Sequence, residues 1–403
     1  MTDLSDYVAA FEARAAEVLV AAARAVPALA DRVAAAGLAP DDLGSLAALR
    51  RLPILDKDDV LELQTKAPPF GGLLAPGTRL RRVFQSPGPL YEPEMDEPDP
   101  WRGAPALAAA GFTADDVVLN CFGYHLSPAG VMFEESARAL GATVIPAGVG
   151  NMELQARAAR DLGATAYTGT PSYLKALLEK ASALEGPPLR FERAVVGAEP
   201  LPPSLRSWLG ERVPTVRQMY GTAEAGLLGY ECEENSGWHV PDDALVEVCA
   251  LDDGQPVPEG TEGQVVVTLF HPHYPLIRFG TGDLSAFAAG ECPCGRPTPR
   301  LVGWLGRSGE AVKVRGMFLH PRQVTQVMGQ VRSVAAYRFL IERSDDKDML
   351  RCEIVPADGV DPGEAAAAVK DAARSGLRFT VDVAVVEAID GDGSPVTDLR
   401  TWD

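Results

Sequence analysis

Three cysteines and one histidine form the clearest set of candidate metal ligands in the sequence. Cys232 and His239 lie seven residues apart with Gly237 between them, and Cys292 and Cys294 flank a proline. Three thiolates and one imidazole are the ligand set of closed structural zinc sites, in which four protein ligands leave no open position for a substrate. We therefore expect these four side chains to bind a structural Zn²⁺ ion.

The alternative is that all six cysteines are free thiols, the usual state of cysteine in a reducing compartment. Cys121, Cys249 and Cys352 fit this alternative, because they lie in or beside apolar runs where a thiol packs as a small hydrophobic group. The Cys292–Cys294 doublet lies instead in a loop of glycine and proline, a composition that favours a metal ligand over a core residue.

The elements that must position such residues follow from the pattern of apolar runs. Between residues 115 and 200, short apolar runs alternate with helical stretches, and this order predicts a parallel sheet with flanking helices. The expected strands are 116–120, 142–146, 164–167 and 193–197, and the expected helices are 130–140, 152–162 and 172–183. Ligands of such sheets bind at the carboxyl ends of the strands. The loops expected to form the pocket walls are 121–130, 146–151, 168–172 and 197–200.

The remaining chain predicts a helical start, a β-rich part and a separate small domain. The first 50 residues are rich in alanine, and strands dominate after residue 240. A glycine-rich stretch follows at 306–309, where we place the boundary between domains of residues 1–306 and 307–403. The second domain is expected to hold strands near 311–315, 334–342, 350–355 and 381–387 and helices near 321–331 and 363–375.

The charge of the chain limits its partners. A net charge of −19, from 37 basic and 56 acidic residues, disfavours binding to nucleic acid or an anionic membrane, so we expect neither. The N-terminal residues are acidic where a signal peptide requires basic ones, and no apolar run of about 18 residues is present. We therefore expect a cytoplasmic protein.

Several segments, in order, resemble the motifs of adenylate-forming enzymes. They are Tyr220-Gly221-Thr222-Ala223-Glu224, Arg278-Phe279-Gly280-Thr281-Gly282-Asp283, and Gly306-Arg307 through Gly316. Others resemble the phenylacetate-CoA ligase branch of that superfamily: Gly123-Tyr124-His125, Thr170-Pro171-Ser172-Tyr173, Gly197-Ala198-Glu199-Pro200 and the candidate zinc ligands. The resemblance extends from about residue 50 to the C-terminus, and the number and order of its motifs make it specific.

The resemblance implies both a fold and a reaction. The fold is α/β, with a large N-terminal adenylate-forming domain of mixed or parallel sheets, flanking helices and a β-rich subdomain, followed by a small, mobile α+β domain. In the reaction, a carboxylate attacks the α-phosphate of ATP to give acyl-AMP and pyrophosphate. The small domain then rotates, and the thiol of coenzyme A displaces AMP. A small aromatic carboxylic acid is the implied substrate; carrier-protein pantetheine stays open as the acceptor, and so does a homodimer.

Three residues match the family positions closest to the chemistry. Asp283 matches the carboxylate that holds both ribose hydroxyls, and Arg307 matches the guanidinium that contacts the nucleotide. Glu224 matches the carboxylate that helps to bind Mg²⁺, a hard cation that prefers oxygen. The alternatives are a surface turn for Asp283, an interdomain salt bridge for Arg307 and a solvated cap for Glu224.

Other matches concern the adenine, the acid and the thiol. The segment Gly197-Ala198-Glu199-Pro200 matches the loop that packs on adenine, where small residues let the backbone approach a flat base, and Tyr220, Gly221 and Thr222 belong to the same nucleotide site. Tyr124 and His125 fall on the loop that walls the acyl pocket, although a structural role for the histidine stays open. Gly316 matches the glycine that lets pantetheine pass.

The sequence departs from the family where the phosphates are handled. The family's phosphate loop is rich in glycine and hydroxyl groups, but here Pro87 and Pro89 remove two N–H donors and Glu92 adds a negative charge. The family's C-terminal lysine is also missing, because alignment on Arg400 puts Thr397 at its position.

Three hypotheses follow from these losses. The first is a working ligase with slow or rearranged adenylation, in which Arg81, Arg82 or Arg400 supplies the missing charge. The second is transfer of a preformed activated acid to a thiol, without activation by ATP. The third is a non-catalytic homologue that binds a nucleotide or an acyl group.

Overall fold

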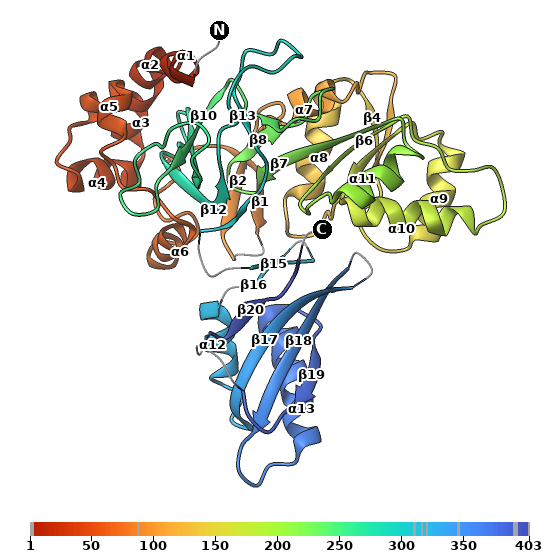
Figure 1. The fold of residues 1–403 in the computed structure, drawn as a ribbon. Coiled ribbons are helices and arrows are strands. Elements are labelled where there is room, and N and C mark those ends of the chain that lie inside the picture. The colour runs from red at the N-terminus through yellow and green to blue at the C-terminus, as the bar shows by residue number, and fades with distance from the viewer. Residues whose placement is uncertain are drawn as a thin grey trace. The chain divides into compact units, whose positions relative to one another are not determined.

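The computed structural model describes residues 4–86, 89–308, 312–315, 317–319, 321–344, 347–389 and 394–401. The chain forms two compact units, Met1–Ser308 and Gly309–Asp403 (Figure 1). Gly316, expected beside the pantetheine, lies outside the described residues, as do Pro87 and Gly88 of the phosphate segment.

An eight-stranded mixed sheet forms the centre of the first unit, in the order β13-β9-β8-β7-β6-β5-β3-β4. Its parallel strands are β3 (Val117–Asn120), β4 (Thr143–Pro146), β5 (Ala166–Gly169), β6 (Arg193–Gly197) and β7 (Thr215–Thr222). The antiparallel strands are β8 (Gly226–Tyr230), β9 (Trp238–His239) and β13 (Arg300–Leu301). The predicted α/β class with a mixed sheet is thus confirmed.

Helices cover both faces of this sheet because successive strand residues point to opposite sides. Val118 packs with α7 (Ala104–Ala109) and α8 (Ala129–Ala139) in one apolar cluster. Leu119, the next residue, packs in a second cluster with the helices of the other face. Those helices are α9 (Met152–Asp161), α10 (Pro171–Ser182) and α11 (Pro203–Gly210).

A second, antiparallel sheet carries the residues expected at the ribose. Its order is β10 (Ala244–Cys249), β11 (Gly263–Leu269), β12 (Phe279–Ser285) and β14 (Gly306–Arg307). The N-terminal helical elements pack against it through a shared apolar cluster that includes Phe11, Leu43 and Val246. They are α1 (Leu4–Ala9), α2 (Glu12–Arg14), a π-helical turn (Ala15–Leu19), α3 (Val20–Ala25), α4 (Pro27–Ala35), a 3-10 turn (Pro40–Gly44) and α5 (Leu46–Leu49). Helix α6 (Lys57–Lys66) and the hairpin of β1 (Leu80–Gln85) and β2 (Tyr91–Met95) follow.

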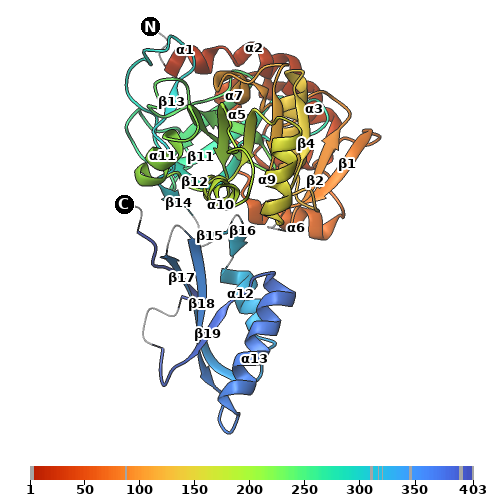
Figure 2. The same cartoon turned by 90° about the vertical axis from the view of Figure 1, so that its right-hand side faces the viewer.

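The second unit is a small α+β structure. Its four-stranded sheet has the order β19 (Asp382–Val385), β18 (Lys347–Pro356), β17 (Val334–Ser344) and β20 (Val396–Asp398). Helices α12 (Pro321–Met328) and α13 (Pro362–Ala372), with a π-helical turn at Ala373–Leu377, pack on this sheet through a common apolar cluster (Figure 2). A short hairpin of β15 (Val312–Val314) and β16 (Met317–Leu319) belongs to the same unit. Among the described residues of the whole chain, no helix is long and apolar enough to cross a membrane.

Candidate functional site

Asp283 lies at the centre of a polar cluster in the first unit. The pairing of β12 with β14 sets Asp283 opposite Arg307, and Arg307 Nε lies 3.0 Å from Asp283 Oδ1 in a largely buried ion pair. The hydroxyl of Tyr220, from β7, donates to Asp283 Oδ2 at 2.9 Å. The indole N–H of Trp304 donates to Oδ1 at 3.0 Å. Two hydrogen-bond donors and one ion pair therefore hold the carboxylate that is expected to meet the ribose.

Tyr220 is held in its donor role by its surroundings. Burial, and then the charge of Asp283, raise the pKa of Tyr220 well above its usual range, so the hydroxyl keeps its proton. Its ring stacks on Trp238 with the centroids 5.1 Å apart. Trp304 belongs to none of the sequence motifs, and no spacing in the chain signals its contact with Asp283.

The segment expected to pack on adenine begins where β6 ends. Gly197 approaches β7 so closely that a Cβ there would lie 2.8 Å from the carbonyl oxygen of Met219. Ala198 has a φ of 65°, a left-handed conformation that costs an L-residue energy and that is concentrated at functional sites. Glu199 accepts a hydrogen bond of 2.6 Å from Ser172 Oγ. Two of the loops expected as pocket walls, 168–172 and 197–200, are therefore joined.

The residues expected at the acyl pocket follow β3. The hydroxyl of Tyr124 accepts a hydrogen bond of 2.6 Å from Asn120 Nδ2, which also donates to the carbonyl of Gly130. Gly130 lies directly against the tyrosine ring, because a Cβ there would be 2.8 Å from Tyr124 Cδ2. Tyr124 is half-buried and fixed, whereas His125 is exposed.

Glu224 follows β7 and is almost fully buried. Lys57, the first residue of α6, places its Nζ 2.8 Å from Glu224 Oε1. Burial alone would raise the pKa of Glu224, but the charge and hydrogen bond of Lys57, together with hydrogen bonds from the backbone and from Thr222, outweigh burial and hold that pKa below its usual range. The neighbouring Thr222 uses its hydroxyl to accept from the amide of Ala225. Sequence reasoning missed Lys57, since the contact joins residues 167 positions apart and no motif signals it.

The segment that is expected in place of the phosphate loop lies between β1 and β2, and of it the structure describes Ser86, Pro89 and Leu90. The two strands are still paired at Gln85 and Tyr91. The amide of Ser86 donates to the carbonyl of Leu90 at 2.8 Å. That amide is therefore already bonded to a carbonyl of the chain itself.

The arginines considered as replacement cations are each held by carboxylates. Arg82 contacts Glu94 at 2.7 Å, and Arg81 contacts Glu135 at 3.2 Å. In the second unit, Arg400 lies 2.9 Å from Asp348 and 2.7 Å from Asp398, and its side chain is 4% exposed. The neighbouring carboxylates thus balance each of these charges.

The predicted zinc ligands come together at the edge of the large sheet. Cys232 follows β8, His239 is on β9, and Cys292 and Cys294 precede β13, which pairs with β9. The four ligand atoms all lie within 4.8 Å of one another. Cys232 Sγ is 3.6 Å from Cys292 Sγ, and Cys294 Sγ is 3.3 Å from His239 Nε2.

These distances fit a tetrahedral metal. With a Zn–S bond of about 2.3 Å and a Zn–N bond of about 2.05 Å, tetrahedral geometry requires S···S and S···N separations of about 3.8 and 3.6 Å. His239 Nδ1 lies 3.0 Å from the carbonyl oxygen of Thr298, the contact that typically orients a metal-binding histidine through its second nitrogen. The four residues can therefore hold Zn²⁺.

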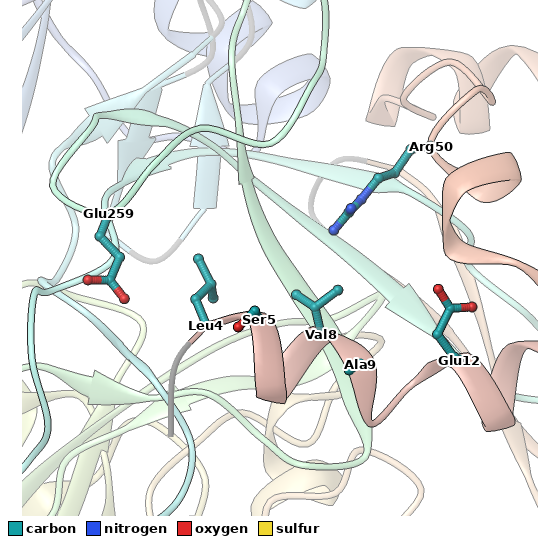
Figure 3. Close-up of a pocket in the computed structure, with 7 residues that line it drawn as sticks. All are labelled: Leu4, Ser5, Val8, Ala9, Glu12, Arg50 and Glu259. Carbon is teal, nitrogen blue, oxygen red and sulfur yellow. The ribbon is translucent and has the colours of Figure 1, made fainter. Parts of the chain in front are cut away.

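A hollow of about 530 Å³ lies elsewhere in the first unit, against α1 (Figure 3). It is lined by Leu4, Ser5, Val8, Ala9, Glu12, Arg50 and Glu259. None of the residues predicted for the nucleotide, the acid or the metal lines it.

Comparison with known proteins agrees with the fold. The model of the AMP-binding enzyme family matches residues 103–269. The phenylacetate-coenzyme A ligase of Thermus thermophilus is 31% identical over 337 residues, 79% of this chain and 75% of that protein. The Escherichia coli K12 protein of the same name is 29% identical over 350 residues, 82% of this chain and 78% of that protein. A solved structure of 2-hydroxyisobutyryl-CoA ligase with 2-HIB-AMP and CoA matches with a TM-score of 0.87 and 25% identity, covering 98% of this chain and 90% of that one.

The fold and the matched residues define an AMP-binding enzyme of the adenylate-forming class. Within that class the chain belongs to the family of the phenylacetate-CoA ligases, as a distant homologue.

Proposed function

We propose that this chain is an AMP-forming acid–thiol ligase that acts on a small, phenylacetate-like carboxylic acid through acyl-AMP and a CoA thioester. The observation that carries the proposal is the Asp283 cluster, in which Tyr220, Trp304 and Arg307 converge on one buried carboxylate. A carboxylate oriented in this way can accept hydrogen bonds from two vicinal hydroxyls, which is what a ribose offers. The substrate class comes from the relatives named phenylacetate-coenzyme A ligase.

The residues predicted for the nucleotide, the acid and the thiol have roles in this proposal. Asp283 holds the ribose, Arg307 contacts the phosphate of AMP, and Glu224 takes part in binding Mg²⁺, which would balance phosphate charge. The segment Gly197–Pro200 packs on adenine, and Tyr124 and His125 border the acid. Gly316 is the proposed passage for the pantetheine of CoA or of a carrier protein. The second unit, Gly309–Asp403, is proposed to be the mobile domain that the sequence predicts over residues 307–403.

We further propose that adenylation is the weaker half-reaction. The Ser86 amide, which a phosphate loop would present to the nucleotide, is bonded to the Leu90 carbonyl, and alignment on Arg400 puts Thr397 at the family's lysine position. Arg400 is already bound by Asp348 and Asp398, which argues against its serving as the replacement cation. Removal of a single such electrostatic contact typically costs about 10²–10³-fold in rate.

The same observations favour a second candidate function. In it, the chain transfers a preformed acyl-AMP to a thiol and does not itself consume ATP. Acyl-AMP has a single phosphate, next to the ribose. Its binding therefore does not need the altered region that would contact the β- and γ-phosphates of ATP. A homologue that only binds a nucleotide or acyl group is the third alternative.

Calorimetry with AMP on the purified chain tests the nucleotide site directly. We expect binding by the wild type and its loss in Asp283→Ala, with Asp243→Ala as a control carboxylate outside the cluster. ATP–pyrophosphate exchange with a panel of acids, including phenylacetate and 2-hydroxyisobutyrate, then measures adenylation. Thioester formation from synthetic acyl-AMP and CoA measures the second half-reaction. Absence of AMP binding in the wild type would overturn the proposed function.

A further inference from the structure

Two tryptophans connect Asp283 with the cluster of predicted metal ligands. Trp304 donates its indole N–H to Asp283 Oδ1 at 3.0 Å. Trp238 stacks on Tyr220, with the ring centroids 5.1 Å apart and the ring planes at 21° to each other. Tyr220 in turn donates to Asp283 Oδ2 at 2.9 Å. Each oxygen of the carboxylate is therefore oriented by a tryptophan, directly at Oδ1 and through Tyr220 at Oδ2.

Both tryptophans are placed by the pairing of β9 with β13. Trp238 is on β9, next to the predicted ligand His239, and lies opposite Leu301 of β13. Trp304 follows shortly after Leu301 in the chain. A shift in the pairing of these two strands would therefore move both tryptophans relative to the carboxylate that they orient.

The segment that follows β13 also runs beside β12, the strand that carries Asp283. The amide of Val302 donates to the carbonyl of Ala286 at 2.9 Å, and the amide of Leu305 donates to the carbonyl of Leu284 at 2.9 Å. A movement of β13 would therefore reach Asp283 along the backbone as well as through the tryptophans.

The pairing of β9 with β13 is short and is braced by the predicted ligands. Each strand has two residues, too few to be stable through backbone hydrogen bonds alone, and β9 pairs with β8 at a single position. The predicted ligands, here called the Cys–His cluster, are Cys232, His239, Cys292 and Cys294. The histidine is on β9, two of the cysteines precede β13, and the four ligand atoms lie within 4.8 Å of one another. A metal ion held there would join the two strands across a long loop, where such a link constrains the chain most.

We propose that Trp238 and Trp304 are positioning residues for Asp283, and that the Cys–His cluster, with a metal ion bound, keeps them in place by fixing the pairing of β9 with β13. The proposal rests on the proposed function for the role of Asp283 at the ribose. It predicts that metal in the cluster raises the affinity of the chain for the ribose hydroxyls of a nucleotide. By linkage, the nucleotide raises the affinity of the cluster for the metal by the same factor.

Calorimetric titration of two nucleotides into the full-length chain, with zinc bound and after its removal by a chelator, tests the proposal. The nucleotides are AMP and 2′,3′-dideoxy-AMP, which lacks the hydroxyls that Asp283 is proposed to hold. We expect metal removal to weaken AMP binding at least about fivefold, the lower end of the usual coupling between two sites, and to leave the binding of dideoxy-AMP unchanged. Added zinc should restore the affinity for AMP. A general loss of structure would instead weaken both nucleotides alike, and that result overturns the proposal.

Three variants separate positioning from packing. Trp304→Phe removes the indole N–H and keeps an aromatic ring, so it should weaken AMP binding to the zinc-bound chain by about tenfold or more. Metal removal should then have a smaller effect in this variant than in the wild type, because two changes that act on the same contact are not additive. Cys292→Ser should reproduce the metal-free wild type. Cys121→Ser is the matched control, since Cys121 is buried but lies outside the cluster, and it should bind AMP as the wild type does.

The competing explanation is that apolar packing alone holds the two tryptophans. Trp238 belongs to the largest apolar cluster of the first unit, and Trp304 packs against that cluster. In that case the metal-free and the zinc-bound chain bind AMP equally, which overturns the proposal and leaves the proposed function intact. Should the metal-free chain unfold, the zinc-bound Trp304→Phe variant decides, and wild-type affinity for AMP in that variant overturns the proposal.

The outcome is separable from that of the proposed function. Wild-type protein that binds AMP but no metal refutes the role of the Cys–His cluster alone. Zinc-bound wild-type protein that binds neither nucleotide refutes the ligase assignment, and with it the role of Asp283 at a ribose.

Discussion

If the four clustered side chains bind zinc as predicted, loss of one of them should both empty the metal site and destabilise the first unit. We consider Cys292→Ser, because Cys292 is 8% exposed and its Sγ lies 3.6 Å from Cys232 Sγ, within the range that a shared metal requires. Burial raises the pKa of Cys232 to about 11, so without a metal this thiol stays protonated at neutral pH. A metal ion must displace that proton, and metal affinity should therefore fall as the pH is lowered.

The size of the effect follows from mass action. A ligand present at about 1,000 times its dissociation constant stabilises the native state by about 4 kcal/mol. One kcal/mol shifts the melting temperature of a large domain by about 2–4 °C. Removal of the metal should therefore lower the melting temperature by roughly 10 °C. The loss of stability should be largest at β9 and β13, the short paired strands that carry or adjoin the ligands.

Metal analysis of the purified chain and thermal melting with increasing chelator are the assays. We expect about one zinc per chain in the wild type, as a closed four-ligand site requires, and almost none in Cys292→Ser. Cys121→Ser is the control, since Cys121 is buried but lies outside the cluster of ligand atoms. Wild-type protein without zinc near one equivalent, or wild-type metal content in Cys292→Ser, would refute the reasoning.

Three further changes test other parts of the first unit. Asp283→Asn should weaken AMP binding by about 10- to 150-fold, the worth of one charged hydrogen bond, in calorimetry; unchanged affinity would remove Asp283 from the ribose site. Ala198→Gly should raise the free energy of unfolding by up to about 1 kcal/mol in urea titrations, because glycine relieves the positive φ, and a loss of stability would contradict this account of the strain. Burial would raise the pKa of Asp116, but hydrogen bonds from Thr165 and from the Thr113 amide, with the charge of Arg193, hold it below 3.8. The stabilisation that ionised Asp116 provides is therefore complete above its unfolded-state pKa and is lost as the pH falls through its folded-state pKa. The difference in the free energy of unfolding between wild type and Asp116→Asn, measured in urea titrations at several pH values, should therefore narrow in acid.

The fold was predictable because the apolar pattern is strong where strands are buried. Val118 and Leu119 serve opposite faces of the sheet, and such continuous apolar runs bounded by helical stretches define the parallel strands from sequence. Strands such as β9 and β14 have two residues each and cannot be recognised from periodicity. Strand β20 was missed because Val396–Asp398 has one buried apolar residue, and only its pairing with β17 defines it.

The candidate site was predictable where residue identity carries the chemistry. The candidate metal ligands were predicted from side-chain type and spacing, and the cluster of ligand atoms agrees with that choice. Trp304 and Lys57 were missed because a tryptophan or a lysine is chemically unspecific until its partner is known. Arg400 was considered as a replacement cation because its charge is evident from the sequence. Its contact with Asp348 is not evident there, because Asp348 is 52 residues away.

The two ends of the proposed nucleotide site differ in how much of their bonding capacity is already used. At the ribose end, Asp283 is oriented by donors on both oxygens and still has the lone-pair capacity to accept from hydroxyls, so a nucleoside gains contacts without breaking any. At the phosphate end, Ser86 donates its amide to the carbonyl of Leu90, and Lys57 is engaged by Glu224. The β- and γ-phosphates of ATP would have to break these contacts before they could bind the same groups. The single phosphate of AMP or acyl-AMP lies next to the ribose and does not need these groups. This asymmetry predicts that the chain discriminates between AMP and ATP by their phosphates and not by their nucleoside, and that thioester formation from acyl-AMP is the half-reaction to measure first.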